Sequence, residues 1–148
     1  MYNTISIDGR KINIKDILAI YYVQDKYIKN EKNYYVSVFT THGSYQVYTQ
    51  KERGEVFQVI KNAYEKFIQN KIKNFAFLEH KYLINMDKVK ILDVMSTPWQ
   101  TKELMSCFTT GHKLTIQTIN PEITKHDYLL QHNSYKHLPK PKNDVLEI

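Results

Sequence analysis

The sequence predicts a mostly β protein of the α+β class, built from antiparallel sheets with one main helix at about residues 51–70 and a short C-terminal helix. Short runs in which apolar and polar residues alternate recur along the chain, with turn residues between them. Twelve of the 148 residues are tyrosines, which suit the half-buried face of a sheet. Residues 49–70 are the only long stretch in which apolar residues recur at helical spacing.

The N-terminal part is expected to form two hairpins joined by a strand. Ile5 and Ile7 alternate with polar residues, the turn falls at Asp8–Gly9, and Ile12 resumes the alternation. A buried strand is predicted from Ile17 to Val23. The stretch QDKYIKNEKN that follows is predicted to be a polar loop, because it is too charged to bury. The stretch YYVSVFTTHGSYQVYT is then predicted to form the second hairpin.

The second half of the chain is predicted to return to strands after the main helix. These expected strands are Phe75–Leu78, Tyr82–Ile84, Val89–Val94, Glu103–Thr109 and Lys113–Ile119. The segment INPEITKHDYLLQH is predicted to be a loop followed by the short helix, with Pro121 near its first turn. We expect one domain over residues 1–131 and a loosely held tail over residues 132–148.

Two pairs of short segments resemble each other within the chain. INIKDI (Ile12–Ile17) is similar to INMDKV (Ile84–Val89), and VFTTHG (Val38–Gly43) is similar to CFTTGH (Cys107–His112). Hairpins that use the same turn chemistry explain such similarity, so we predict no duplicated domain from it.

The motif content predicts a protein that is not an enzyme and that needs no metal and no cofactor. Motifs for phosphate-binding loops, dinucleotide sites, serine nucleophiles and zinc proteases are absent from the sequence. Six histidines are spread along the chain, and the spacing of the last three does not match a zinc site. A single cysteine, Cys107, excludes an intrachain disulfide. Without a signal peptide or a membrane-length apolar run, a soluble cytoplasmic protein with no membrane contact is expected.

The charge favours a polyanionic partner, since the net charge is +6 and the pI is about 9.2. Lysine side chains neutralise phosphates, whereas asparagine and histidine can donate hydrogen bonds to base edges. Three predicted loops concentrate such residues. The candidate DNA-binding residues are Lys26, Tyr27, Lys29 and Lys32 in the first loop, His80 and Lys81 in the second, and Asn120 and Lys125 in the third.

The order of these elements resembles the LytTR domain, the mostly β DNA-binding module of LytR/AlgR-type bacterial regulators. The opening ISIDGRKINIKDILAI, the hairpins, the single helix and the later FAFLEHKYLINMDKVKIL follow the pattern of that family. The matching positions are Phe75, Tyr82, Leu83, Ile84, Asn85, Val89 and Leu92 in the middle motif, and Leu114 and Ile116 in the closing hairpin. The resemblance covers residues 3 to about 131. It implies an elongated series of sheets whose three loops, those given above, enter successive grooves of duplex DNA.

The chain departs from the family pattern in the polar part of the middle motif. The family's arginine and histidine correspond to Phe77 and Glu79, and its basic residue and serine correspond to His80 and Lys81. A carboxylate at Glu79 would repel a phosphate. The chain could therefore bind DNA through His80 and Lys81 alone, read a different sequence, or have lost DNA binding.

Three functional hypotheses follow. The first is a stand-alone LytTR-type transcriptional regulator, because Met1 leads directly into the first strand and leaves no room for a receiver domain. Such a regulator would be controlled by abundance, by homodimerisation or by a regulatory protein partner. In it, Lys26, Lys29, Lys32 and Lys81 would contact phosphates, and His80 and Asn120 would contact bases. The alternatives are a protein-interaction module on a LytTR-like scaffold and, from the tyrosine content, an RNA-binding protein.

Overall fold

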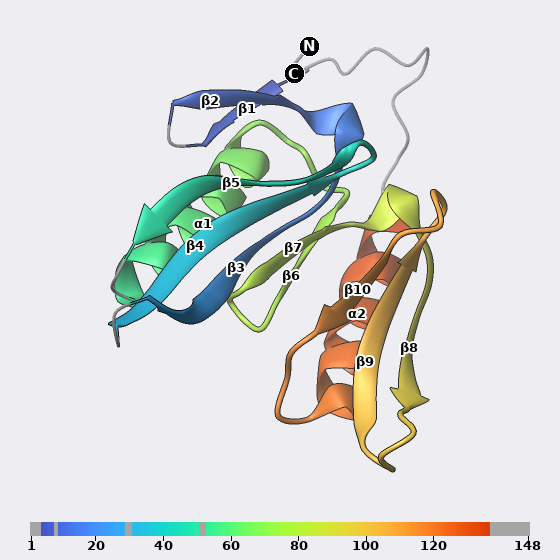
Figure 1. The fold of residues 1–148 in the computed structure, drawn as a ribbon. Helices are drawn as coiled ribbons and strands as arrows, with labels where there is room; N and C mark the ends of the chain where they lie inside the picture. Colours follow the sequence, from blue (N-terminus) through green and yellow to red (C-terminus); the bar gives the residue numbers. More distant parts are fainter. Residues whose placement is uncertain (1–3, 8, 29–30, 51–52, 137–148) are drawn as a thin grey trace.

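The structure is a computed structural model that describes residues 4–7, 9–28, 31–50 and 53–136; the side chains of residues 24–28, 31–33, 48–50, 53–54, 56 and 136 are not described. The described residues contain three antiparallel sheets and two α-helices (Figure 1). This confirms the predicted mostly β, α+β class.

The sheets are formed by strands that follow one another closely in the sequence. The two-stranded sheet consists of β1 (Thr4–Ile7) and β2 (Arg10–Asn13). The five-stranded sheet has the order β5-β4-β3-β7-β6, from β3 (Ile17–Ile28), β4 (Glu31–Thr40), β5 (Gly43–Gln50), β6 (Phe75–Leu78) and β7 (Tyr82–Asn85). The three-stranded sheet has the order β10-β9-β8, from β8 (Val89–Ser96), β9 (Lys102–Phe108) and β10 (Lys113–Ile116).

The described residues also form two α-helices and two short 3-10 turns. The α-helices are α1 (Arg53–Gln69) and α2 (Pro121–Lys136), and the short 3-10 turns are η1 (Ile14–Asp16) and η2 (Met86–Lys88). Helix α1 matches the main helix predicted over residues 51–70, and Pro121 is the first residue of α2, as its fixed φ favours.

The predicted polar loop after Val23 is wrong, because β3 continues to Ile28 and β4 begins at Glu31. Beyond Tyr21, among the described strands, β3 pairs with β4 and no longer with β7. Beyond Gln24, the residues of β4 that pair with β3 no longer pair with β5, so the two strand ends form a two-stranded extension of the sheet. The segment QDKYIKNEKN lacks the apolar alternation that identifies a strand, and these strand ends were therefore missed.

The end predicted for the domain, residue 131, lies within a helix. Helix α2 spans 16 residues and continues through residues 132–136, which were assigned to the tail. Tyr128 is buried, and Tyr135, two helical turns further on, packs beside the same core and donates a hydrogen bond to Asp87. These contacts extend the helix beyond the length that its polar sequence suggests. Residues 137–148 of the predicted tail lie outside the described residues.

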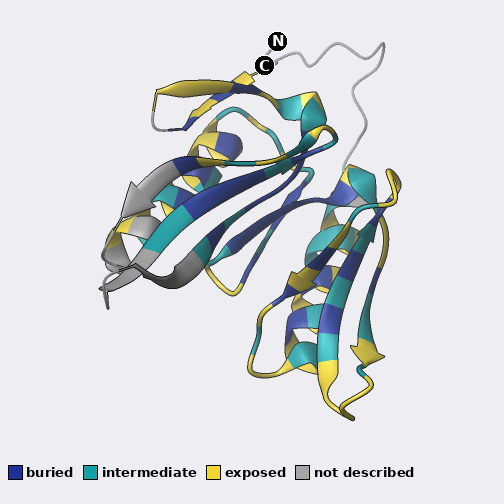
Figure 2. Ribbon diagram, in the orientation of Figure 1, coloured by how far each residue is buried: buried dark blue, intermediate teal, exposed yellow. Residues whose placement is uncertain are grey.

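Two apolar clusters form the core (Figure 2). The first lies between the β1–β2 hairpin, α1 and one face of the five-stranded sheet, and includes Ile60, Phe67 and Leu83. The second lies where β6 and β7 meet the three-stranded sheet and α2, and includes Leu104 and Phe108. Full burial of each such side chain contributes roughly 1.5–3 kcal/mol to folding.

The described chain contains the same order of elements twice. The first repeat is β1-β2-η1-β3-β4-β5-α1, and the second is β6-β7-η2-β8-β9-β10-α2. Asn13 and Asn85 precede η1 and η2, and each side-chain oxygen accepts a hydrogen bond from the amide two residues later, at 3.0 and 3.1 Å. The similar segments INIKDI and INMDKV therefore mark a structural repeat, which the sequence analysis did not predict.

Details of pairing support this equivalence. The register of β3 with β4 shifts between Ile17 and Ala19, and that of β8 with β9 shifts between Val89 and Ile91. A backbone hydrogen bond also links the residue after the second strand to the residue before the first in each pair, from the Thr41 amide to the Asp16 carbonyl and from the Thr109 amide to the Lys88 carbonyl.

The β6–β7 hairpin joins the two repeats. It opens the second repeat, yet β7 pairs with β3 of the first. Phe75 and Leu83 from this hairpin lie in the first cluster, whereas Ala76 and Ile84 lie in the second. The turn of this hairpin, which carries the divergent motif, therefore lies at the junction of the repeats.

Candidate nucleic-acid interface

The motif turn, defined as Glu79, His80 and Lys81, connects β6 to β7. Glu79 and His80 adopt left-handed backbone conformations, with φ of 56° and 53°. Residues other than glycine rarely adopt such angles, and they persist only where the surroundings impose them. The Lys81 amide donates to the Leu78 carbonyl at 3.0 Å and closes the turn. The three side chains are thereby presented by a tight, defined backbone.

Glu79 fastens this turn to the start of α2. The Thr124 hydroxyl donates to Glu79 Oε1 at 2.6 Å, and the Thr118 hydroxyl lies 2.7 Å from that of Thr124. Thr124 is buried in the first turn of α2, where the helix dipole favours a negative charge. The carboxylate that was expected to repel phosphate is thus engaged by the protein itself.

A second contact holds the β10–α2 connection (residues 117–120) against β7. The Gln117 amide donates to the Tyr82 hydroxyl at 2.9 Å. Burial raises the pKa of Tyr82 above its ordinary value, because it disfavours the charged phenolate. The hairpin that carries the motif turn is therefore held at two points, by Thr124 of α2 and by Gln117 of the β10–α2 connection.

His80 and Lys81 are each placed by an aromatic ring. The His80 ring meets the Phe77 ring edge-on, with centroids 5.5 Å apart. The Lys81 ammonium lies 5.5 Å from the centre of the Tyr22 ring on β3, a cation–π distance. The motif turn is thereby set against β3 of the first repeat as well as α2 of the second.

These groups border an open hollow of about 500 Å³. It is lined by Phe57, Glu79, His80, Lys81, Gln117, Thr118 and Ile119. Ile119 is fully exposed to solvent. An apolar residue just before a helix N-cap often packs against its own helix. Ile119 was therefore not predicted to be a site residue from the sequence.

Asn120, a predicted base-contacting residue, has a structural role as the N-cap of α2. Its side-chain oxygen accepts from the Ile123 amide at 3.2 Å, and its carbonyl accepts from the Thr124 amide. The residue remains exposed at the rim of the β10–α2 connection. The side-chain oxygen is thus engaged in capping, which leaves the NH₂ group for other contacts.

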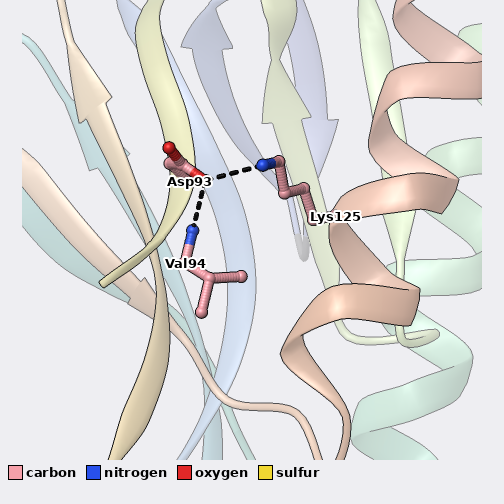
Figure 3. Close-up of polar contacts among 3 residues, drawn as sticks. All are labelled: Asp93, Val94 and Lys125. Atoms are coloured by element: carbon pink, nitrogen blue, oxygen red, sulfur yellow. Dashed lines mark hydrogen bonds and ion pairs between the residues drawn. The ribbon is translucent and has the colours of Figure 1, made fainter. Parts of the chain in front are cut away.

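Lys125 does not stand in a loop, as predicted, but in α2. Its ammonium lies 2.7 Å from Asp93 Oδ1 on β8, and the Val94 amide donates to the same oxygen (Figure 3). The hydrogen bond from Lys125 lowers the pKa of Asp93 and, in return, raises the pKa of Lys125. The charge of Lys125 is therefore balanced within the protein.

The first predicted segment is positioned by the long β3–β4 hairpin. Lys26 and Tyr27 lie on β3 and Lys32 lies on β4, with side chains that are not described, and Lys29 lies outside the described residues. The far end of this hairpin, the motif turn and the β10–α2 connection lie on the same side of the molecule (Figure 1).

No family model, curated protein or solved structure matches the chain. Among the residues that the structure describes, no group of three or more His, Cys, Asp or Glu side chains could hold a metal ion. Neither α1 nor α2 is long and apolar enough to cross a membrane.

Proposed function

We propose that the protein is a transcriptional regulator of the LytTR type that binds duplex DNA along the side formed by the motif turn and the β10–α2 connection. The observation that carries the proposal is the hydrogen bond between Glu79 and Thr124. It joins the motif turn to α2 beside the hollow in which His80 and Lys81 meet Ile119, the residue before the exposed Asn120, although these residues come from distant parts of the sequence.

Each polar group in this arrangement has a distinct task in the proposal. Lys81 contacts a phosphate, because an ammonium on a flexible stem neutralises charge without selecting a base. His80 hydrogen-bonds a base edge in the major groove. Asn120 donates only through its NH₂ group, because its oxygen caps α2, so it contacts a single base acceptor rather than binding adenine bidentately.

Lys26 and Lys32 extend the contact along the backbone of the duplex from the β3–β4 hairpin, with Lys29 between them in sequence. Lys125 is left out of this set, because its ammonium is paired with Asp93. The protein acts in this proposal as a cytoplasmic regulator that binds repeated half-sites as a homodimer, with a regulatory protein as a possible controlling partner.

The test is binding to a random-sequence duplex pool, followed by affinity measurements on the enriched site at rising salt. Lys81→Ala is expected to weaken binding to all sequences and to lower the salt slope by about one unit. The matched control is Lys15→Ala, an exposed lysine in η1 at the start of β3, which should leave the slope unchanged. A flat salt response without an enriched sequence contradicts the proposal.

One observation favours a second candidate, a protein-interaction module on the same scaffold. The hollow combines a carboxylate, Glu79, with the fully exposed Ile119, a mixture that suits a protein surface. Glu79→Gln separates the two, because glutamine keeps an acceptor for Thr124 and removes the charge. DNA affinity should rise if the site binds DNA, whereas only a protein partner would respond under the second candidate. Competition between duplex DNA and RNA tests the RNA-binding alternative.

A further inference from the structure

Trp99 is the only tryptophan of the chain, and the fold does not bury it. It lies in the turn between β8 and β9, with 86% of its surface exposed. Tryptophan combines a large, mostly apolar ring with an N–H donor and is enriched at binding interfaces, so its exposure here marks a candidate contact with a partner. Folding alone therefore does not account for this residue.

The turn that carries Trp99 is firmly structured. The Thr97 and Thr101 hydroxyls lie 2.6 Å apart, and the Thr97 hydroxyl also accepts from the amides of Trp99 and Thr101. The Thr97 amide donates to the Thr101 carbonyl at 2.8 Å, and the Gln100 amide donates to the Thr97 carbonyl at 3.0 Å. Pro98 further restricts the backbone. A partner that binds Trp99 thus pays little entropy to order the turn.

The internal repeat assigns a counterpart to this turn. The β8–β9 hairpin of the second repeat occupies the place of the β3–β4 hairpin in the first, whose ends carry Lys26 and Lys32. The free end of β8–β9 lies on the same lower side of the molecule as the motif turn and the β10–α2 connection (Figure 1). The Trp99 turn therefore continues the proposed interface at the end opposite to the β3–β4 hairpin.

The composition of the turn fits a duplex better than a protein partner. The segment STPWQTK, residues 96–102, contains one lysine and no acidic residue, so it can approach phosphates without repulsion. Its other residues are mostly hydroxyl and amide side chains, rather than the apolar surroundings typical of a protein hot spot.

We propose that Trp99 is an additional DNA-contacting residue, whose indole packs against bases or sugars at one end of the bound duplex segment. Aromatic and apolar side chains that enter a groove in this way partly unstack a base step or cover the sugar edge. The inference rests on the proposed function, because it places Trp99 on the same duplex as His80 and Lys81.

Fluorescence provides the direct test, because emission from the single tryptophan reports on Trp99 alone. Acrylamide quenching is measured for the free protein and at saturation with the enriched duplex, while the anisotropy of labelled DNA reports binding independently. Bound DNA should lower the quenching constant several-fold. If the duplex binds and quenching is unchanged, the Trp99 inference is overturned and the proposed function stands. If no duplex binds, the proposed function itself fails.

Substitution gives a second measurement. Trp99→Ala should weaken duplex binding about tenfold, and Trp99→Phe should retain most of the affinity because a ring still stacks. The matched control is Ile68→Ala, an exposed apolar residue on α1, which should not change affinity. Because Trp99 is exposed, circular dichroism of both variants should match the parent protein. Equal DNA affinity of Trp99→Ala and the parent overturns the inference, including the case in which Trp99 serves a protein partner instead.

Discussion

Asn13 and Asn85 occupy the same position in the two repeats but have different surroundings. Asn85 is only 2% exposed, and its NH₂ group donates to the Ile17 carbonyl at 2.8 Å. Its oxygen accepts from Asn74 and from the Asp87 amide, both at 3.1 Å. Asn13 is exposed and accepts from the Lys15 amide. The buried copy thus satisfies groups in both repeats, and the exposed copy caps a single turn.

We therefore expect Asn85→Ala to lower the free energy of unfolding by about 2–3 kcal/mol, because it leaves a buried carbonyl without its donor. Asn13→Ala is the matched control, with an expected loss of about 0.5–1 kcal/mol from the lost cap. Urea denaturation followed by circular dichroism measures both. Equal losses for the two variants would show that burial at this position is unimportant.

Glu79 illustrates what a single residue's sequence context can and cannot reveal. The departure from the family motif was visible in the sequence, and so was the charge that it introduces. Its partner Thr124 lies 45 residues away, and nothing in either segment specifies the pairing. The chemistry of the candidate site was therefore predictable in part, whereas the hydrogen bond from Thr124 to Glu79 depends on the packing of α2 against the β6–β7 hairpin.

Edge strands in this fold are protected by side chains from α2. Gln131 donates to the Phe77 carbonyl at 2.9 Å and accepts from the Phe77 amide at 2.8 Å, which occupies polar groups of the edge strand β6. An unprotected edge can pair with another chain.

We expect Gln131→Ala to lower the free energy of unfolding by about 1–2 kcal/mol and to increase self-association at high concentration. Urea denaturation and size-exclusion chromatography measure the two effects, with Gln58→Ala on α1 as control. A monomeric, equally stable variant would contradict this role.

Strand β8 is protected by a different device, the pair of Asp93 and Lys125 beside the Val94 amide. The pKa of Asp93 is lowered in the folded protein, so its contribution is present above the ordinary value of 3.8 and is lost as the pH falls through the lowered pKa. The pKa of Lys125 is raised, so its contribution is lost only as the pH rises above 10.5.

Asp93→Asn should accordingly be less stable than the parent at neutral pH, with a difference that shrinks as the pH falls below 3.8. Stability at several pH values, from urea denaturation, measures this difference. Glu65→Gln, which removes an exposed carboxylate on α1, is the control. A difference for Asp93→Asn that stays constant from neutral to acidic pH would show that the pair does not act through its charge.

The helices and strands differ in how well their bounds could be predicted from the sequence. Strands with one buried face, such as β9 with its alternating burial, were predicted from periodicity. Strand β7 is buried at every residue because it serves both repeats, and its apolar run still identified it as a strand. The ends of β3 and β4 were missed because the segment QDKYIKNEKN carries no apolar alternation. Helix α2 was predicted to be too short, because few of its residues are buried and its sequence therefore shows little apolar periodicity.

At the scale of the whole molecule, the candidate interface depends on the junction of the two repeats. The motif turn belongs to the second repeat, but Lys81 lies over Tyr22 of the first. Since β7 pairs with β3 and Tyr82 lies opposite Tyr21, the turn is held beside the middle of β3. Local patterns predicted each loop's chemistry, and only this long-range pairing determines which loops lie together.

Because the β6–β7 hairpin contributes to both clusters, we expect the two repeats to unfold together. Each cluster would lose part of its core if the other repeat opened, because Phe75 and Leu83 serve the first and Ala76 and Ile84 serve the second. A variant in either cluster should therefore destabilise the whole described fold, rather than one repeat.

Phe67→Ala and Phe108→Ala test this, since the two side chains lie in different clusters and are at most 2% exposed. Each should cost about 3–5 kcal/mol. Amide hydrogen exchange should show that either variant accelerates exchange in both β4 and β9 to a similar extent, because the slowest amides exchange through global unfolding. If Phe67→Ala accelerates exchange in β4 alone, the repeats open independently, and the hairpin does not couple them.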